Sequence, residues 1–314
     1  MYREQIKVID CTVRDGGLIN NHYFEDDFVR AVYKYLSKAG VDYMEFGYRC
    51  SKELFPTCDF GAWKYSDDDK ISEIIDGIES DMKTCIMVDA HRVLEQVFKP
   101  ADESPVDMIR VATYVKDIDK AINLTKKVHD LGYETTVNIM AISKESEFDL
   151  IEALKQLSTC PTDAVYVVDS FGALYSEQIE YYVKMYQENL PGKEIGIHCH
   201  NNQQLAFGNT IEAIVRGANY LDGSLYGIGR GAGNCCLELL LGFLKNPKYR
   251  LDPVLQLIQD YMIPMREKIE WGYIIPYMIT GILNEHPRAA IARRASKDKD
   301  KYAEFFKEII TQME

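Results

Sequence analysis

The stretch Gly196-Ile197-His198-Cys199-His200-Asn201-Asn202 combines the pattern of a short buried strand with two imidazole side chains. Ile195 and Ile197 alternate with smaller or polar residues, as they would in a strand. Because alternate residues of a strand point to the same side, His198 and His200 should project together at its C-terminal end. Two imidazoles at this spacing can share one divalent cation. Two histidines that only cap the strand by hydrogen bonding are the less favoured interpretation.

Outward from this strand, short apolar runs alternate with amphipathic helical stretches as far as about residue 245. Besides the histidine strand, we expect strands at 6–10, 43–48, 85–89, 108–115, 135–142, 164–168 and 220–226. We expect helices at 26–39, 67–78, through Leu94 and Val97, and at 118–131, 148–157, 177–190, 205–215 and 234–244. Eight β/α units predict an α/β fold, a closed (β/α)8 TIM barrel. A doubly wound open sheet is the alternative, but no G-x-G-x-x-G fingerprint follows the first strand.

The pattern divides the chain into a TIM-barrel catalytic domain, residues 1–250, and a helical C-terminal extension, residues 251–314, that packs on the barrel. Helical periodicity runs from Pro253 to about Ile269 and again from Ala289 to Ile310, around an aromatic and apolar segment. The chain stops within a helical pattern, as a piece of a longer protein would.

Composition excludes several classes of function. The formal net charge of −13 argues against nucleic-acid binding. The N-terminus has no secretory signal, and no apolar run is long enough to span a bilayer, which argues against a membrane role. The 8 cysteines are scattered and include no C-x-x-C pair, which favours reduced thiols and a cytoplasmic location.

Polar side chains collect where the predicted strands end, which is where barrel enzymes carry their active sites. Asp15 is the best candidate for a third, anionic metal ligand, although it could instead cap a turn. Arg14 could bind a carboxylate or stabilise an enolate, or form an ion pair with Asp15 or Glu45. Asn234 could add a neutral oxygen ligand or act as a helix N-cap. The other candidates at this rim are Asp10, Thr12, Tyr48, Arg49, Asp89, His91, Asn138, Asp169, Ser170 and Arg230.

Three segments together resemble one family. Asp10-Cys-Thr-Val-Arg14-Asp15-Gly16 resembles the D-x-T-L-R-D-G opening of the metal-dependent pyruvate aldolase and acyltransferase barrels, which are HMG-CoA lyase-like. The segment from His198 to Asn202 is similar to the H-x-H segment of that family, and residues 229–234 are similar to its G-x-G-x-G-N segment. The segments occur in the order of the family, and the resemblance covers residues 6 to about 245. Residues 167–173 look closest to the 4-hydroxy-2-oxovalerate aldolase branch.

The resemblance implies a divalent metal, Mn²⁺ or Mg²⁺, held by Asp15, His198 and His200, with Asn234 as a further candidate ligand. It implies that Arg14 stabilises an enolate. Thr12, Asp169 and Ser170 would contact the substrate, and Tyr277 would lie near it.

Two departures concern the general base. The aldolase branch has a histidine soon after R-D-G, where this chain has Leu18. His22 lies four residues later and could substitute for it, or cap the next helix. The lyases have a cysteine just before their G-N, and this chain has none there.

From these features we expect a metal-dependent carbon–carbon lyase that cleaves or forms a 4-hydroxy-2-oxo acid through a metal-bound pyruvate enolate. His22, Tyr277 or metal-bound water would act as the base. An HMG-CoA lyase-like or Claisen-type acyl-CoA enzyme is one alternative. Another is a non-catalytic barrel that docks on an aldehyde dehydrogenase. The expected partners are a 2-oxo acid substrate and either further copies of the chain or such a dehydrogenase.

Overall fold

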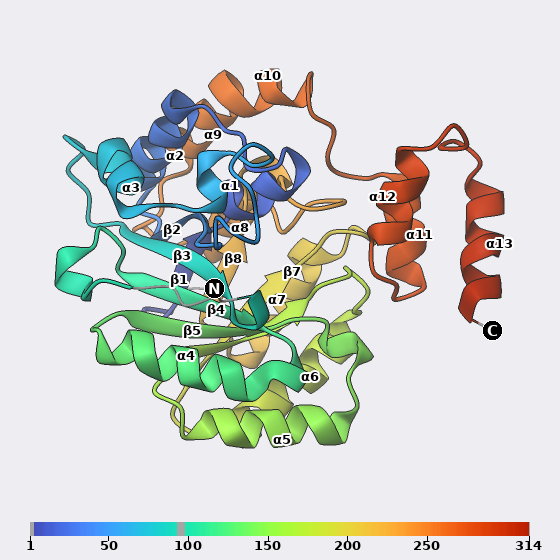
Figure 1. Cartoon of the computed structure of the whole chain (residues 1–314), viewed down its shortest axis with the longest axis horizontal. Coiled ribbons are helices and arrows are strands. Elements are labelled where there is room, and N and C mark those ends of the chain that lie inside the picture. The colour runs from blue at the N-terminus through green and yellow to red at the C-terminus, as the bar shows by residue number, and fades with distance from the viewer. Residues whose placement is uncertain (1–2, 93–97, 314) are drawn as a thin grey trace.

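The computed structural model of the chain describes residues 3–92 and 98–313. Within these residues, eight parallel strands form a closed barrel in which each strand pairs with the next in sequence and the last pairs with the first (Figure 1). The strands are β1 (Lys7–Asp10), β2 (Tyr43–Tyr48), β3 (Lys83–Asp89), β4 (Met108–Thr113), β5 (Glu134–Ile139), β6 (Ala164–Asp169), β7 (Glu194–Cys199) and β8 (Tyr220–Gly223). This topology confirms the predicted TIM barrel and excludes the open sheet.

α-Helices connect the successive strands, except between β3 and β4, where the described residues form only 3-10 turns. Gly40 and Gly217 cap the C-terminal ends of α2 and α7, and their φ angles of 75° and 108° lie in the left-handed region that glycine tolerates. The helix expected through Leu94 and Val97 lies outside the described residues. The helices of the barrel are α1 (Thr12–Gly16), α2 (Asp26–Ala39), α3 (Asp68–Ile75), α4 (Ile118–Asp130), α5 (Glu147–Ser158), α6 (Ser176–Asn189), α7 (Ala206–Arg216) and α8 (Leu237–Leu244).

Several elements are shorter than predicted, for local backbone reasons. β5 ends at Ile139, because Ala141 has a φ of 57° and leaves the strand conformation. β8 ends at Gly223, and the chain then enters a 3-10 turn in which Tyr226 has a φ of 52°. The last barrel helix begins at Leu237 and not at Asn234, because Asn234 forms an isolated β-bridge with His200.

Side chains fill the barrel, as expected for this fold. Toward the N-terminal ends of the strands, one buried cluster consists of Ile9, Tyr43, Cys85 and Met108. Above it, Arg110 from β4 is fully buried, and its guanidinium carbon lies 4.6 Å from the centroid of the Tyr166 ring. The interior therefore places a charged group directly below the polar end of the barrel.

The C-terminal region has two parts. α9 (Leu251–Leu257), a π-helical turn (Ile258–Met262) and α10 (Ile263–Arg266) form one helical run that packs against α2, and Val254 and Leu257 belong to the main core. α11 (Ile275–Ile282), α12 (Arg288–Arg294) and α13 (Tyr302–Met313) form a second, smaller core to one side of the barrel (Figure 1). The division at residue 250 stays a prediction.

The helix expected from 289 to 310 is broken in two. The charged segment 297–301 lies between α12 and α13, and it offers no apolar face to bury. The break turns α13 back, so that Phe305 and Ile309 pack in the same cluster as Ile279 and Ala290. No helix among the described residues is long and apolar enough to cross a membrane.

Candidate active site

Asp15, His198 and His200 meet at the C-terminal end of the barrel. The Oδ2 atom of Asp15 lies 3.4 Å from Nε2 of His198 and 4.0 Å from Nε2 of His200. One ligand atom from each of the three buried residues lies within 4.8 Å of the other two. A cation between them would find two imidazole nitrogens and one carboxylate oxygen, a donor set that suits divalent metals.

Asp15 is held by the turn that follows β1. The chain passes directly into α1, whose five residues are all buried, so the carboxylate is carried on a short helix and not on the strand itself. The backbone N–H of Arg230 donates to Oδ1 of Asp15 at 2.8 Å. The first and last β/α connections therefore fix this carboxylate together.

Both histidines are oriented by their other ring nitrogen. Nδ1 of His198 donates to Oδ2 of Asp222 at 2.9 Å, and Nδ1 of His200 donates to the carbonyl oxygen of Gly233 at 3.3 Å. Such second contacts fix the tautomer and the ring orientation of metal-binding histidines. Each Nε2 is thereby directed toward Asp15.

A buried ionic network lies under the ligand group. Arg14 contacts Asp15 at 2.5 Å and Glu45 at 2.7 Å. Arg110 contacts the same Glu45 at 2.8 Å and Asp222 at 2.7 Å. Three carboxylates thus face two guanidinium groups, which leaves one negative charge for a cation to balance.

The protonation states of two of the candidate ligands suit a cation. Burial alone would raise the pKa of Asp15, but nearby positive charge, chiefly that of Arg14, outweighs it and holds that pKa well below its usual range. Burial, with the charge of Arg230, holds the pKa of His200 well below its usual range. At neutral pH Asp15 is therefore anionic and His200 neutral, as metal ligands must be.

His198 behaves differently when no cation balances the site. Burial would lower its pKa, but the carboxylates of Asp15 and Asp222 on either side of the ring outweigh burial and raise it. A proton on His198 therefore offsets the negative charge of Asp15 and Asp222, as a bound cation would.

Asn234 completes the neighbourhood. Its bridge to His200 places it beside the ligand group, and a Cβ built on Gly229 would lie 2.3 Å from its Nδ2 atom and 3.0 Å from Oδ1 of Asp15. Its Oδ1 atom is buried and has no hydrogen-bond partner among the described residues. An unpartnered buried oxygen beside two imidazoles and a carboxylate fits a divalent metal as a further ligand.

A cavity of about 50 Å³ opens in front of the ligand group. That is room for a few non-hydrogen atoms, because a cavity needs about 10–15 Å³ to hold one water molecule. Polar groups line one part of the wall and aliphatic side chains the rest. The lining residues are Arg14, Asp15, Leu18, Tyr48, Met87, Ala112, Asn138, Met140, Val168, Ser170, His198, His200 and Arg230.

Ser170, the proposed substrate contact at the end of β6, lies on this cavity. Its hydroxyl accepts a hydrogen bond from the backbone N–H of Ala141 at 2.8 Å, and its carbonyl oxygen accepts one from Arg230. The serine thus ties the loops after β5, β6 and β8 to one another at the mouth of the site.

Two other proposed substrate contacts, Thr12 and Asp169, are not among the residues that line the cavity. The hydroxyl of Thr12 donates to Asp10 at 2.5 Å and accepts from the backbone N–H of Leu225 at 2.8 Å. The Asp169 carboxylate accepts backbone N–H groups of the loop that follows β6, those of Ala173 and Leu174. In the described residues both side chains support the turns that shape the site.

The two proposed bases, His22 and Tyr277, also lie outside the lining. The ring of His22 is buried against Gly17 and meets the Tyr48 ring edge-on at 5.6 Å, and neither of its nitrogens has a hydrogen-bond partner in the described chain. The Tyr277 ring packs against Gly231, and its hydroxyl accepts a hydrogen bond from Arg294 at 3.2 Å.

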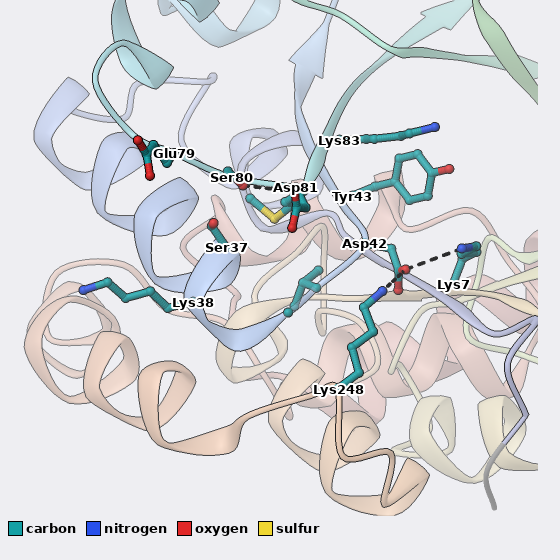
Figure 2. A pocket seen from close by; sticks show the side chains of 13 residues that line it. Lys7, Ser37, Lys38, Asp42, Tyr43, Glu79, Ser80, Asp81, Lys83 and Lys248 are labelled. Carbon is teal, nitrogen blue, oxygen red and sulfur yellow. Dashed lines mark hydrogen bonds and ion pairs between the residues drawn. The ribbon is translucent and has the colours of Figure 1, made fainter.

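A larger cavity, of about 720 Å³, is at the opposite end of the barrel. It lies at the starts of β1, β2 and β3, where Lys7 and Lys248 both approach Asp42 (Figure 2). This end of a TIM barrel serves stability. Three of the lysines that line the cavity, Lys7, Lys83 and Lys248, already pair with carboxylates. The larger cavity therefore does not compete with the site at Asp15.

Arg110 and Asp222 are parts of the site that our sequence analysis did not single out. They lie within the apolar runs of β4 and β8 and are 112 residues apart. A charged residue inside a strand that is otherwise buried was the available signal, since such a charge needs a partner inside the barrel.

Comparison with known proteins agrees with this geometry. The fold and site are those of barrel enzymes that act at the C-terminal ends of their strands. Residues 5–260 match the model of the HMGL-like family, and the chain belongs to that family. A 4-hydroxy-2-oxovalerate aldolase of Bacillus cereus is 28% identical over 277 residues, which cover 86% of this chain and 80% of the aldolase. The 4-hydroxy-2-oxovalerate aldolase of Roseiflexus castenholzii is 31% identical over 238 residues, which cover 76% of this chain and 70% of that aldolase.

A relative with another activity is similar to a comparable degree. An oxaloacetate decarboxylase of Mycobacterium tuberculosis is 29% identical over 244 residues, 78% of this chain and 71% of the decarboxylase. Among solved structures, the N-terminal domain of a putative aldolase from Bacteroides vulgatus superposes with a TM-score of 0.80 at 29% identity and covers 95% of this chain and all of that domain. The HMG-CoA lyase of Brucella melitensis shares the fold, with a TM-score of 0.65 at 16% identity. The superposition covers 84% of this chain and 100% of that lyase. The chain is a carbon–carbon lyase.

Proposed function

We propose that this chain is a divalent-metal-dependent aldolase that cleaves or forms a 4-hydroxy-2-oxo acid through an enolate of pyruvate. The observation that carries the proposal is the convergence of Asp15, His198 and His200 within 4.8 Å, beside the buried Arg14 and a small cavity. Similarity to 4-hydroxy-2-oxovalerate aldolases supports the substrate class.

Asp15, His198 and His200 would hold the metal, with the Asn234 oxygen as a further ligand. When bound, Mn²⁺ or Mg²⁺ supplies Lewis acidity toward the oxygens of a 2-oxo acid. Arg14, fixed by Glu45, adds a guanidinium that stabilises the negative charge of the enolate.

Removal of the proton from the 4-hydroxyl group needs a base. His22 stays a candidate from its place in the sequence. Burial, with the charges of Lys64 and Arg14, lowers its pKa to about 3, so its ring is neutral at pH 7 but accepts a proton only weakly. Leu18 lines the cavity where the resembling aldolases carry their histidine, so His22 would have to reach past it. Tyr277 is a candidate only if its hydroxyl leaves Arg294.

Decarboxylation of a 2-oxo acid that carries a carboxylate at C3 is a second candidate function. It forms the same enolate without deprotonating a hydroxyl group. Apart from the three proposed ligands, the polar side chains that line the cavity are proton donors or neutral groups: Arg14, Tyr48, Asn138, Ser170 and Arg230. The similarity to an oxaloacetate decarboxylase agrees with this candidate.

The test combines elemental analysis with a pyruvate-release assay on a panel of 4-hydroxy-2-oxo acids and oxaloacetate. We expect about one divalent metal per chain and metal-dependent release of pyruvate. His200→Ala should lose the metal and at least about 100-fold in turnover, because Asp15 and His198, even with Asn234, hold the ion poorly without the second imidazole. His129→Ala, an exposed histidine on α4, is the matched control and should keep both.

Full activity after chelation would refute the metal site. Release of pyruvate from oxaloacetate alone would select the second candidate. We further propose a cytoplasmic location. We also propose that the chain assembles either with further copies of itself or with an aldehyde dehydrogenase. Size-exclusion chromatography of the protein alone and with a dehydrogenase would test the assembly.

A further inference from the structure

We propose that Tyr48 is the proton donor of the reaction, the residue whose hydroxyl group delivers a proton to C3 of the enolate. The inference depends on the proposed function, because it names the acid that acts on the same intermediate. It holds for both candidate reactions, since each ends in that enolate.

Tyr48 lies on the wall of the small cavity in front of Asp15. It ends β2 and lines the same cavity as Arg14, Asp15 and His200. His22 and Tyr277, the other candidates for proton transfer, are absent from that lining in the described residues. Of the residues on the wall, Tyr48 alone carries a phenol.

The second step concerns its hydroxyl group. Tyr48 is half-buried, and its hydroxyl oxygen makes no hydrogen bond within the described chain. That oxygen is also absent from the buried polar atoms without a partner, so it reaches space that solvent or a ligand can enter. A phenol open to the cavity with no partner of its own can contact a substrate without first breaking a bond.

The third step concerns charge. The Cζ atom of Arg14 lies 6.0 Å from the centroid of the Tyr48 ring, and Nζ of Lys64 lies 4.9 Å from it. Burial raises the pKa of Tyr48, so the phenol keeps its proton at neutral pH. Arg14 favours the phenolate that remains after donation, which makes the transfer reversible.

The proton balance is simple. Breaking the C3–C4 bond leaves its electron pair in the enolate, and that carbon then needs one proton. The O–H bond of Tyr48 breaks as the new C3–H bond forms, and the phenolate regains a proton from water. The products are pyruvate and an aldehyde, or pyruvate and carbon dioxide.

The decisive experiment follows the reverse step, exchange of the methyl protons of pyruvate in D₂O, by NMR with Mg²⁺-loaded protein. Tyr48→Phe should slow exchange by about 100-fold or more, the usual range for loss of a general acid. Binding of oxalate, a planar dianion shaped like the enolate, should change less than twofold by calorimetry. Tyr65→Phe, whose hydroxyl donates to the carbonyl of Phe55 in the neighbouring loop, is the matched control and should exchange at the wild-type rate.

Exchange by Tyr48→Phe at the wild-type rate would overturn the proposal, and so would an equal loss of oxalate binding, which would mark a structural role. If the wild-type protein neither exchanges pyruvate protons nor cleaves any substrate of the panel, the proposed function itself fails. The two failures are therefore distinguishable.

Discussion

At the scale of single residues, His22 combines an uncommon backbone conformation with an uncommon environment. Its φ angle is 62°, its side chain is 1% exposed, and its carbonyl oxygen would lie 2.1 Å from a Cβ on Gly61. The chain holds an imidazole in a dry position next to two cations, Lys64 and Arg14. The free energy of unfolding should therefore depend on the protonation of His22, and so on pH.

We predict that His22 makes the protein less stable in acid. The pKa of His22 is about 3 in the folded chain, against 6.5 for an ordinary histidine. Below pH 6.5 the unfolded chain therefore binds a proton at this residue and the folded chain does not. The free energy of unfolding should therefore fall as pH falls, with about 3 kcal/mol from this residue between pH 7 and pH 4. Urea unfolding at both pH values measures the loss.

His22→Asn is the matched variant, because asparagine tolerates the left-handed backbone and does not titrate. It should be less stable than wild type at pH 7 and show a smaller drop toward pH 4. A drop equal to that of the wild type would show that His22 does not titrate in this way.

The sequence predicted that Asp15, His198 and His200 lie together, and it did not predict which side chains support them. His198 and His200 alternate in a strand, and Asp15 follows another strand end, so the geometry of a barrel brings them together. The pairing of Arg110 with Asp222 depends on how β4 and β8 face each other across the interior, which a local pattern does not contain.

At the scale of elements, the loop 227–233 shapes the site through its glycines. Gly233 has a φ of 84°, and a Cβ on it would lie 1.9 Å from the carbonyl oxygen of Gly227. Its own carbonyl oxygen accepts hydrogen bonds from His200 and from the backbone of Asn201. A side chain here must therefore move the loop that orients His200, a candidate ligand.

We predict that Gly233→Ala costs about 3 kcal/mol of unfolding free energy, from the left-handed backbone and from overpacking. Its affinity for Mn²⁺ should fall about 10- to 100-fold, as when the supporting contacts of a ligand are lost. Urea unfolding and a Mn²⁺ titration check these values.

Gly192→Ala is the control, since Gly192 has a φ of 78° but no heavy atom within 4 Å of its added Cβ. It should lose about 1–2 kcal/mol and keep its Mn²⁺ affinity. Equal Mn²⁺ affinity in the two variants would contradict the role given to the loop.

Element types were predictable and their ends less so. Strands and helices followed the apolar period closely, and Gly40 and Gly217 end α2 and α7. The early end of β8 was not foreseeable, because Tyr226 takes a left-handed conformation that its sequence neighbours do not indicate. The split between α12 and α13 falls at the charged segment 297–301, and both helices then pack on α11, which is a tertiary effect.

At the scale of the whole molecule, closure of the barrel is what creates the site. β1 pairs with β8, and the backbone N–H of Cys11 donates to Gly223 at 2.8 Å. This brings Asp15, near the start of the chain, against the loop of Arg230, more than 200 residues later. The alternation of strands and helices predicted that closure, whereas the small core of α11–α13 depends on contacts between distant segments.

The central claim is that Asp15, His198 and His200 share one cation. Anomalous X-ray diffraction from crystals of the protein soaked with Mn²⁺ tests it most directly. We predict a single strong manganese peak about 2.1 Å from one oxygen of Asp15 and from Nε2 of both histidines. A structure with no manganese at these three side chains, at saturating Mn²⁺, would contradict the account.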